Sequence, residues 1–348
     1  MEDVITARTV TMPDGRVAAI RRSRAPLPRA EGMALTWFLE GAFGADEKPD
    51  LFLTPAVKGM LEDVARNDFA WAEVDGEVVA TAWMMTPAEE PRLATMGEVY
   101  TDPSWRGRGL APAVCGALID RFDTAGGRVM FLGTGNPSAA RIYRSLGFVP
   151  YPRGLMRRQT GGTGSGRPFE AEWFEPSPVS IRPVTWGDTP RLVALYAEAN
   201  TWLSACWMQG IYSATYVTHD RCNSLTKHTW QATRAGAWVG MVNAQGALVG
   251  SAPMEPRGNE KEALGADIDL FVHPAFHRDA GTLLAAGLAE AGARGWRWLR
   301  AELGAADAAK RALLEAAGFR VAARMPRALA VGDEPQDMAV LRLDLPGA

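Results

Sequence analysis

The segment Met-Gly-Glu-Val-Tyr-Thr-Asp-Pro-Ser-Trp-Arg-Gly-Arg-Gly-Leu-Ala-Pro, residues 96–112, decides the fold of the first half of the chain. Residues 98–100 lie in a β-prone run, and Pro103 ends that run because proline has no N–H to donate to a neighbouring strand. A loop rich in glycine and arginine follows at once, and apolar residues then recur at helical spacing from Ala113 to Phe122. The segment therefore predicts a strand, a glycine-rich loop and a helix in immediate succession.

The loop at 106–111, Arg-Gly-Arg-Gly-Leu-Ala, has the composition of an anion-binding site. Such a loop directs backbone N–H groups and a helix N-terminus at one point, which suits a phosphate or pyrophosphate. Its glycines let an anion approach the backbone, and Arg106 and Arg108 add positive charge. It has neither the Gly-Lys-Ser/Thr of a P-loop nor the three spaced glycines of a dinucleotide fingerprint.

Two motifs together resemble the GNAT acyltransferase superfamily. Arg-x-x-Gly-x-Ala at 106–111 is similar to the pyrophosphate loop of that family, Arg/Gln-x-x-Gly-x-Gly/Ala. Asn-x-x-Ala-x-x-x-Tyr-x-x-x-Gly-Phe at 136–148 resembles the family's helix Asn-x-x-Ala-x-x-x-Tyr-x-x-x-Gly-Phe. The resemblance implies an α/β domain with a mixed, mostly antiparallel sheet flanked by helices. It also implies acetyl-CoA, or another acyl-CoA, as the donor substrate.

The second half of the chain repeats the first. Phe148 follows Pro103 by 45 residues, and Phe319 follows Pro274 by 45, so the two copies are offset by 171 residues. We therefore predict two GNAT-fold domains in tandem, at 1–158 and 179–348, joined by a Gly/Ser/Pro linker at 159–178. The layout resembles tandem GNATs of the mycothiol synthase type and those of antibiotic biosynthetic clusters.

Periodicity and turn residues predict the elements around these motifs. Helices are expected at 30–43, 55–67, 136–146, 189–199, 282–293 and 306–316, hairpins at 5–20, 69–85 and 237–254, and strands at 128–132, 148–157, 267–272 and 296–302.

Composition limits the class of protein. A chain of 348 residues with 47% hydrophobic and 22% charged residues is ordinary for a soluble globular enzyme of about two domains. A net charge of −3 gives no basic surface of the kind that binds nucleic acid. No apolar run is long enough to span a membrane, and three cysteines without metal-type spacing favour a reducing cytoplasm. We expect a cytoplasmic monomer or homodimer.

The offset shows that the second copy has lost motif residues. Arg106 falls on His277, Gly109 on Ala280, Ala111 on Thr282, Asn136 on Asp307 and Tyr143 on Leu314. The second loop also gains Asp279, a carboxylate that would repel a pyrophosphate by roughly 1 kcal/mol or more. The sequence therefore predicts that the first domain keeps the CoA-binding loop and that the second has a degenerate one.

The resemblance also implies roles for single residues. The implied donor-binding residues are Val99, Tyr100, Thr101, Arg106, Gly107, Arg108, Gly109, Leu110, Ala111, Asn136, Ala139 and Tyr143. A backbone N–H of Val99 or Tyr100 would contact the thioester carbonyl, Glu98 would act as general base, and Tyr143 as general acid. Each role has a plainer alternative: a paired strand carboxylate for Glu98, a packed ring for Tyr143 and a helix N-cap for Asn136.

Acceptor-binding residues are harder to predict. Asp267 and Asp269 lie two apart on a predicted strand and would bind a cationic amine or act as base, or be ordinary surface aspartates. Trp202, Trp207 and Tyr212 belong to an aromatic stretch that would form an acceptor wall or pack in the core. His219 and Cys222 have a spacing of three, but no second pair supports a zinc site, so no metal is expected.

The sequence thus predicts an acyl-CoA-dependent N-acyltransferase acting on the amine of a small molecule, with an antibiotic or another specialised metabolite as one class of acceptor. An alternative is a structural or sensing CoA site in the first domain, with any transfer carried out by the second.

Overall fold

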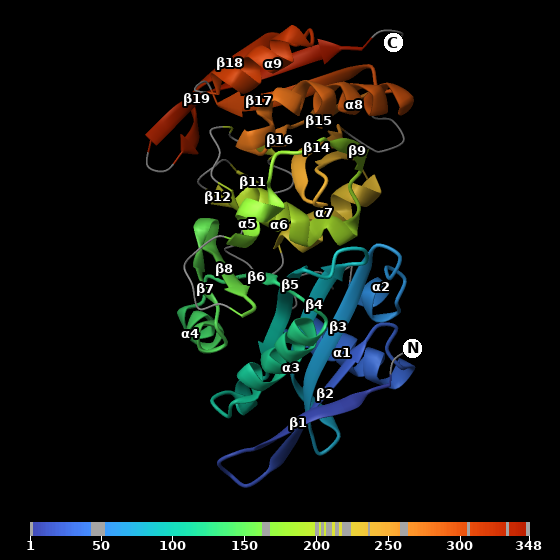
Figure 1. The fold of residues 1–348 in the computed structure, drawn as a ribbon, viewed down its shortest axis with the longest axis vertical. Helices are drawn as coiled ribbons and strands as arrows, with labels where there is room; N and C mark the ends of the chain where they lie inside the picture. The colour runs from blue at the N-terminus through green and yellow to red at the C-terminus, as the bar shows by residue number, and fades with distance from the viewer. Residues whose placement is uncertain are drawn as a thin grey trace. The chain divides into compact units, whose positions relative to one another are not determined.

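The computed structural model describes residues 3–42, 53–161, 168–198, 202, 205–206, 211–212, 216–217, 224–235, 237–257, 264–304, 307–331 and 334–345. It divides into two compact units (Figure 1). The first is residues 1–166 with the short segments 187–190 and 219–223, and the second is the remainder.

The first unit is built on one eight-stranded sheet in the order β1-β2-β3-β4-β5-β6-β8-β7. All neighbouring strands are antiparallel except β5 and β6, which run parallel. The strands are β1 Ile5–Thr11, β2 Val17–Arg24, β3 Ala65–Val74, β4 Glu77–Pro87, β5 Leu93–Thr101, β6 Val129–Gly133, β7 Val149–Tyr151 and β8 Leu155–Gln159. The helices are α1 Arg29–Ala42, α2 Leu53–Val57, α3 Leu110–Thr124 and α4 Pro137–Ser145.

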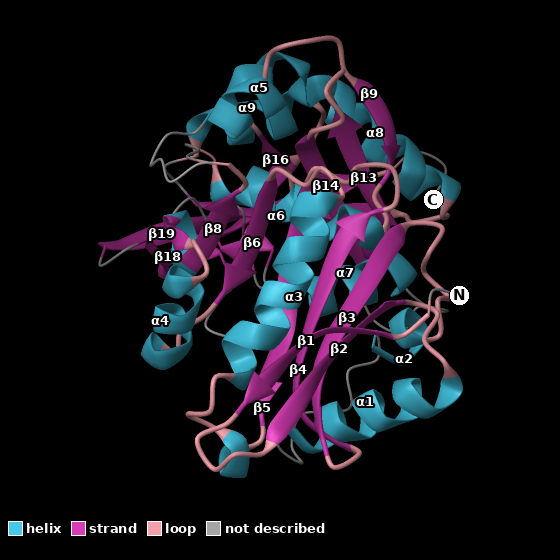
Figure 2. Cartoon of the chain, turned by 60° about the horizontal axis from the view of Figure 1, so that its bottom comes forward, coloured by secondary structure: helices cyan, strands magenta, loops and turns pink. Residues whose placement is uncertain are grey.

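Helix α3 lies across strands β1–β5 and buries the main apolar cluster of this unit (Figure 2). Val114 and Leu118 of α3 are fully buried there with Ala82 and Met84 of β4. Because side chains alternate along a strand, Trp83 faces the other side of the sheet, where its Nε1 donates to Asn67 Oδ1 at 3.1 Å. Both faces of this sheet are therefore buried at its centre.

The second unit repeats the architecture. Its eight-stranded sheet has the order β9-β13-β14-β15-β17-β19-β18, with β16 also paired to β14, and only β15 and β17 are parallel. The strands are β9 Ser180–Pro183, β13 Ala237–Val242, β14 Leu248–Pro256, β15 Gly265–Ile268, β16 Phe271–Val272, β17 Trp298–Gly304, β18 Arg320–Val331 and β19 Glu334–Asp344. The helices are α5 Pro168–Trp173, α6 Thr189–Ala197, α7 Ser224–Ala235, α8 Ala280–Ala293 and α9 Ala308–Ala316, and short strands β10 Ala205–Cys206, β11 Ile211–Tyr212 and β12 Tyr216–Val217 form a small separate sheet.

The element order confirms the predicted α/β class and the tandem repeat. Each unit runs from a first strand through helices to a hairpin, a strand, a loop, a helix, a strand, a second helix and two antiparallel strands. Helices α4 and α9 begin at Pro137 and Ala308, which differ by the 171 residues of the offset. Strand β1 is an addition at the outer edge of the first sheet.

Three predicted elements were wrong in extent. The helix expected at 55–67 ends at Val57, because Gly59 takes a φ of +70° and turns the chain toward β3. The strand expected at 148–157 is divided into β7 and β8 by a 3₁₀ turn at Pro152–Gly154. The strand expected at 267–272 is interrupted after Ile268, where the Leu270 N–H bonds to the side chain of Asp269 at 2.7 Å.

The predicted linker contains ordered structure. Helix α5 lies within 159–178, and its Phe169 and Trp173 are buried and stacked at 5.3 Å between ring centroids. Among the helices that the structure describes, none is long and apolar enough to cross a membrane.

Candidate functional site

Strand β5 carries a bulge at the predicted catalytic position. Thr81 pairs with Tyr100 and Trp83 with Gly97, so two residues of β5, Glu98 and Val99, lie opposite a single residue of β4. Glu98 takes a φ of +47° and is only 3% exposed, and its carbonyl accepts the Thr81 hydroxyl at 2.9 Å. A bulge bends a strand and redirects its side chains, and bulges are common beside active sites.

Pairing between β5 and β6 stops just before the bulge. The last parallel pair is Thr95 with Phe131, whereas β5 continues to Thr101. Beyond Thr95 the ladder no longer uses the backbone groups of β5 that face β6. Beyond this point, β6 does not supply the partners of the β5 backbone groups.

The loop after β5 is fixed by contacts back to the strand. Asp102 caps the 3₁₀ turn η1, Pro103–Trp105, by accepting the Ser104 N–H at 2.9 Å, and the hydrogen bonds from Ser104 lower the pKa of its carboxyl. The Arg106 Nε donates to the Thr101 carbonyl at 3.0 Å. The predicted phosphate residue Arg106 therefore also holds the loop in place.

Two glycines leave the backbone of this loop open. Gly107 and Gly109 have φ of +74° and +80°, and a Cβ added to either would meet no heavy atom within 4 Å. Gly109 is the N-cap of α3 and has no side chain to satisfy the first N–H groups of the helix. Open backbone and uncapped helix donors fit the approach of a phosphate.

A residue cluster that the sequence did not predict lies beside the loop. Arg108 forms an ion pair with Asp14, in the turn between β1 and β2, and Arg16 binds the same carboxylate at 2.8 Å. Both guanidinium groups lie over the ring of Trp105, at 4.4 Å for Arg16 and 5.2 Å for Arg108. Hydrogen bonds from Arg16 and then Arg108 hold the pKa of Asp14 well below its usual range. An Asp-Gly turn in the sequence predicts the hairpin but not its contact with the loop.

Helix α4 brings the second motif to the same side of the sheet. Asn136 caps the helix, and its side-chain oxygen accepts the N–H groups of Ser138 and Ala139 at 2.9 and 3.4 Å. Tyr143 is 5% exposed and packs edge-on against Phe148 at 6.0 Å. Tyr143 belongs to the apolar cluster under α3, and the partly buried Val99, Trp105 and Ala139 pack against that cluster.

The corresponding loop of the second unit is built by the same contacts with different residues. His273 caps the turn η5, Pro274–Asp279, by accepting the Ala275 N–H at 3.2 Å. The ring of His277 bonds to the Val272 carbonyl at 3.0 Å, which repeats the contact of Arg106 with Thr101.

This second loop differs from the first in how its turn leads into the helix. Its turn runs directly into α8 at Ala280, which is 1% exposed, and none of the described residues from Pro274 to Ala280 has a positive φ. His277 stacks on Trp202 at 4.6 Å, and burial lowers the pKa of its ring. An aromatic contact thus takes the position at which the first loop carries Arg106.

In the second unit, an ion pair lies at the position that corresponds to the bulge. The carboxylate of Asp269 forms an ion pair with Lys310 of α9, and these residues are 7% and 1% exposed. By the offset, Lys310 stands where the first unit has Ala139, and Asp269 where it has Glu98. The strand here keeps one register, with Gly250 opposite Val272 and Met254 opposite Ile268. The second unit therefore has a buried ion pair in place of a bulge and a methyl group.

The predicted acceptor residues that the structure describes bind different partners. Asp267 binds Arg257 and Arg300, whereas Asp269 binds Lys310, and burial raises the pKa of Asp267 to about 6 against the pull of Arg257. Trp202 is buried against His277. Tyr212 lies in β11 without a described side chain, and Trp207, His219 and Cys222 lie outside the described residues.

Comparison with known proteins agrees with this geometry. Residues 34–148 match the model of the Acetyltransferase (GNAT) family, a span that includes the bulge, the glycine loop and α4. This part of the chain is a GNAT acetyltransferase domain.

Other similarities are partial. The chain is 38% identical over 89 residues to the mycothiol acetyltransferase of Sanguibacter keddieii, which covers 24% of this chain and only 28% of that protein. A solved N-acetyltransferase of Staphylococcus aureus is 22% identical, with a TM-score of 0.40, over 49% of this chain and 99% of that one. The phosphinothricin acetyltransferase of Sinorhizobium meliloti, solved with acetyl-CoA, is 19% identical with a TM-score of 0.40, over 48% and 88%.

Proposed function

We propose that the GNAT domain of the first unit binds acetyl-CoA, or another acyl-CoA, and transfers the acyl group to the amine of a small molecule. The observation that carries the proposal is the coincidence of three features in one unit. They are the bulge at Glu98, the end of the β5–β6 ladder and the open loop at 106–111. An antibiotic or other specialised metabolite as acceptor is part of the proposal.

In this proposal the donor phosphates bind at the loop. Backbone N–H groups of Gly107, Gly109, Leu110 and Ala111 face the pyrophosphate, because Gly109 leaves the start of α3 uncapped. Arg108 adds a charge, and Arg106 keeps the loop on Thr101 while its guanidinium lies over Tyr100 at 5.8 Å.

The rest of the donor runs toward α4. Asn136 uses its side-chain oxygen as a cap, so contact with the pantetheine arm falls to its amide N–H₂. Ala139 offers only a methyl group toward the arm. Ala139 packs against the apolar cluster that includes Tyr143.

The donor supplies a thioester, in which the acyl carbon is joined to a thiol leaving group. Glu98 takes a proton from the acceptor amine, whose nitrogen then bonds to the acyl carbon. A backbone N–H of Val99 or Tyr100 donates to the carbonyl oxygen as it gains charge. The carbon–sulfur bond breaks, and Tyr143 gives its phenolic proton to the sulfur. The proton removed from the amine replaces it through solvent.

The second unit supports the proposal by contrast. Lys310 and Asp269 neutralise each other in the place that corresponds to Ala139 and Glu98, and a donor arm there would have to separate a buried ion pair. This argues for the first unit as the transferring one. The alternative is that the first unit holds CoA in a structural or sensing role and that the second carries out any transfer. The acceptor residues Trp202, Trp207, Tyr212, Asp267 and Asp269 belong to that alternative.

Native mass spectrometry with acetyl-CoA tests the donor site. Gly109→Asp introduces a carboxylate at the loop, and Gly109→Asn is its matched neutral control, because both residues tolerate a positive φ better than other side chains. Gly281→Asp places the same charge on the exposed first turn of α8. We expect one CoA bound to wild type, Gly109→Asn and Gly281→Asp, and affinity at least about fivefold lower in Gly109→Asp, from a repulsion of about 1–4 kcal/mol.

Two outcomes would contradict the proposal. Undiminished binding in Gly109→Asp together with loss in Gly281→Asp would move the donor to the second unit. Stoichiometric binding without acyl transfer to any of a panel of small amines would favour the structural or sensing role.

A further inference from the structure

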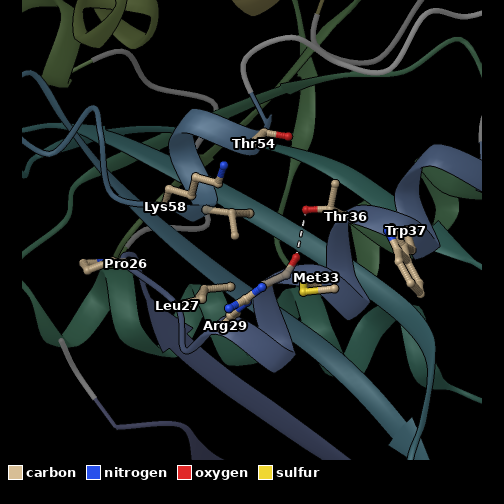
Figure 3. Close-up of a pocket in the computed structure, with 10 residues that line it drawn as sticks. Pro26, Leu27, Arg29, Met33, Thr36, Trp37, Thr54 and Lys58 are labelled. Carbon is tan, nitrogen blue, oxygen red and sulfur yellow. Dashed lines mark hydrogen bonds between the residues drawn. The ribbon is translucent and has the colours of Figure 1, made fainter.

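A pocket of about 470 Å³ lies between α1 and α2 of the first unit, and its described lining residues all belong to the segment 26–58 (Figure 3). Its volume lies within the range of small-molecule sites. Arg29, Met33 and Thr36 line it from one face of α1, because they recur at helical spacing. Phe38 lies on the opposite face of that helix, where its ring contacts Tyr100 of β5 at 5.5 Å. The helix therefore separates the pocket from the proposed transfer site.

Close backbone contacts fix the walls of the pocket. A Cβ on Gly32 would come within 2.7 Å of Val57, so α1 and α2 touch at that glycine. The Leu27 N–H donates to the Val57 carbonyl at 2.9 Å and ties the segment before α1 to α2. Gly59 is equally close to Pro26, where an added Cβ would lie 2.9 Å from the proline ring. The walls of the pocket are therefore held by contacts within the protein.

The described lining of the pocket carries positive charge from both helices. Arg29 stands on the α1 side and Lys58 on the α2 side, next to the hydroxyl of Thr54 (Figure 3). Among the residues that the structure describes, no carboxylate lines the pocket and neither cation forms a salt bridge. Thr36 donates its hydroxyl proton to the Gly32 carbonyl at 2.8 Å, so it can only accept from a ligand. The available donors are therefore those that an anion would use.

The remaining wall is apolar and exposed. Trp37 is 69% exposed and Met33 is 44% exposed, although both are large apolar side chains. A ligand in the pocket could cover both of these side chains with its apolar part. A ligand that covers them needs an apolar body as well as its charged group.

We propose that this pocket binds a small amphipathic carboxylate, with its charge between Arg29 and Lys58 and its apolar part along Met33 and Trp37. Binding is independent of the donor site, so this inference does not depend on the proposed function.

Titration with octanoate, with octanamide as the uncharged analogue, tests the inference by calorimetry on the full chain. The test variant is Arg29→Gln with Lys58→Gln. Arg320→Gln with Arg324→Gln is the control, because both of these exposed arginines lie on β18 and the change in net charge is the same. We expect saturable one-site binding of octanoate, at least tenfold weaker in the test variant and unchanged in the control. Octanamide should bind at least tenfold more weakly than octanoate.

Four results would overturn the inference: no saturable octanoate binding to wild type, equal binding of the amide, equal weakening in the control, or no weakening in the test variant. Trp37→Phe provides a second measurement, because the fluorescence change on octanoate binding should fall with loss of that indole. Gly109→Asp should leave octanoate binding unchanged. That result separates failure of this inference from failure of the donor-site proposal.

Discussion

The two loops of this chain share a scaffold and differ in what they expose. Each is held by one side-chain bond to the carbonyl at the end of its strand, from Arg106 in the first unit and His277 in the second. Each turn is capped by the residue before its proline, Asp102 or His273. Different side chains can make such bonds, so the scaffold survives changes of residue. The open backbone depends on Gly107 and Gly109, and no other residue type adopts their φ as readily.

The two units also differ at the bulge position and on the helix that faces it. The first has a bulge and a small side chain on α4, whereas the second has a buried ion pair. Fold and ligand capacity are therefore carried by different residues. The following experiments test that separation, beginning with the largest expected effect.

Lys310→Ala should destabilise the second unit strongly. It leaves the carboxylate of Asp269 buried without its cation, and breaking a buried pair on one side costs about 3–5 kcal/mol. Urea unfolding would measure the loss. The double variant Lys310→Met with Asp269→Asn should recover most of it, since Asn keeps an acceptor for the Leu270 N–H. A loss in the free energy of unfolding under about 1 kcal/mol in the single variant would mean that the ion pair contributes little to the stability of the second unit.

Ala139→Lys should weaken acetyl-CoA binding by giving the first unit the lysine of the second. The substitution puts the lysine of α9 at the corresponding position of α4, and we expect the dissociation constant of acetyl-CoA to rise at least tenfold. Ser138→Lys is the control, because it adds the same charge at an exposed neighbouring position. If calorimetry gave the same acetyl-CoA dissociation constant for Ala139→Lys and wild type, the lysine would not explain why the two units differ in donor binding.

Tyr143→Phe should slow acyl transfer while leaving donor binding intact. The variant keeps the ring contact with Phe148 and removes the phenolic hydroxyl, and loss of a general acid lowers kcat by tenfold or more. Steady-state rates beside acetyl-CoA binding would separate the two effects. Unchanged kcat would assign Tyr143 to packing alone.

Asp14→Asn should have the smallest effect and the opposite sign. The carboxylate of Asp14 competes with donor phosphate for Arg108, and exposed ion pairs contribute about 0.2–1 kcal/mol. We expect acetyl-CoA to bind about two- to fivefold more tightly at low salt, with the gain shrinking as salt is added. Asp75→Asn is the control, because Asp75 lies exposed in the β3–β4 turn. Weaker binding in Asp14→Asn would show that Asp14 positions Arg108 for the donor instead.

The sequence predicted those features that depend on local pattern. The loop, α4 and the tandem repeat follow from glycine spacing and from a motif repeated at one offset. The cap at Asn136 was among the alternatives, and the structure forms it. The same offset aligns Lys310 with Ala139, so the sequence already shows a lysine in place of a small residue. What that lysine does follows only from the structure, in which it pairs with Asp269.

Features that depend on contacts between distant segments were not predictable. The bulge at Glu98 exists only as a register between β4 and β5, which the sequence of one strand does not determine. The contact of Asp14 with Arg108 joins residues 94 positions apart. The shortened α2 reflects Gly59, whose packing against Pro26 leaves no room for a side chain.

The bulge has a consequence for any attempt to open the second unit. It places one more residue of β5 than of β4 between matching pairs, whereas the corresponding strands of the second unit match residue for residue. Point mutations at Asp269 and Lys310 would remove the ion pair but leave that residue-for-residue pairing in place. A second donor site of the same kind would also need a change of register between β14 and its partner strands.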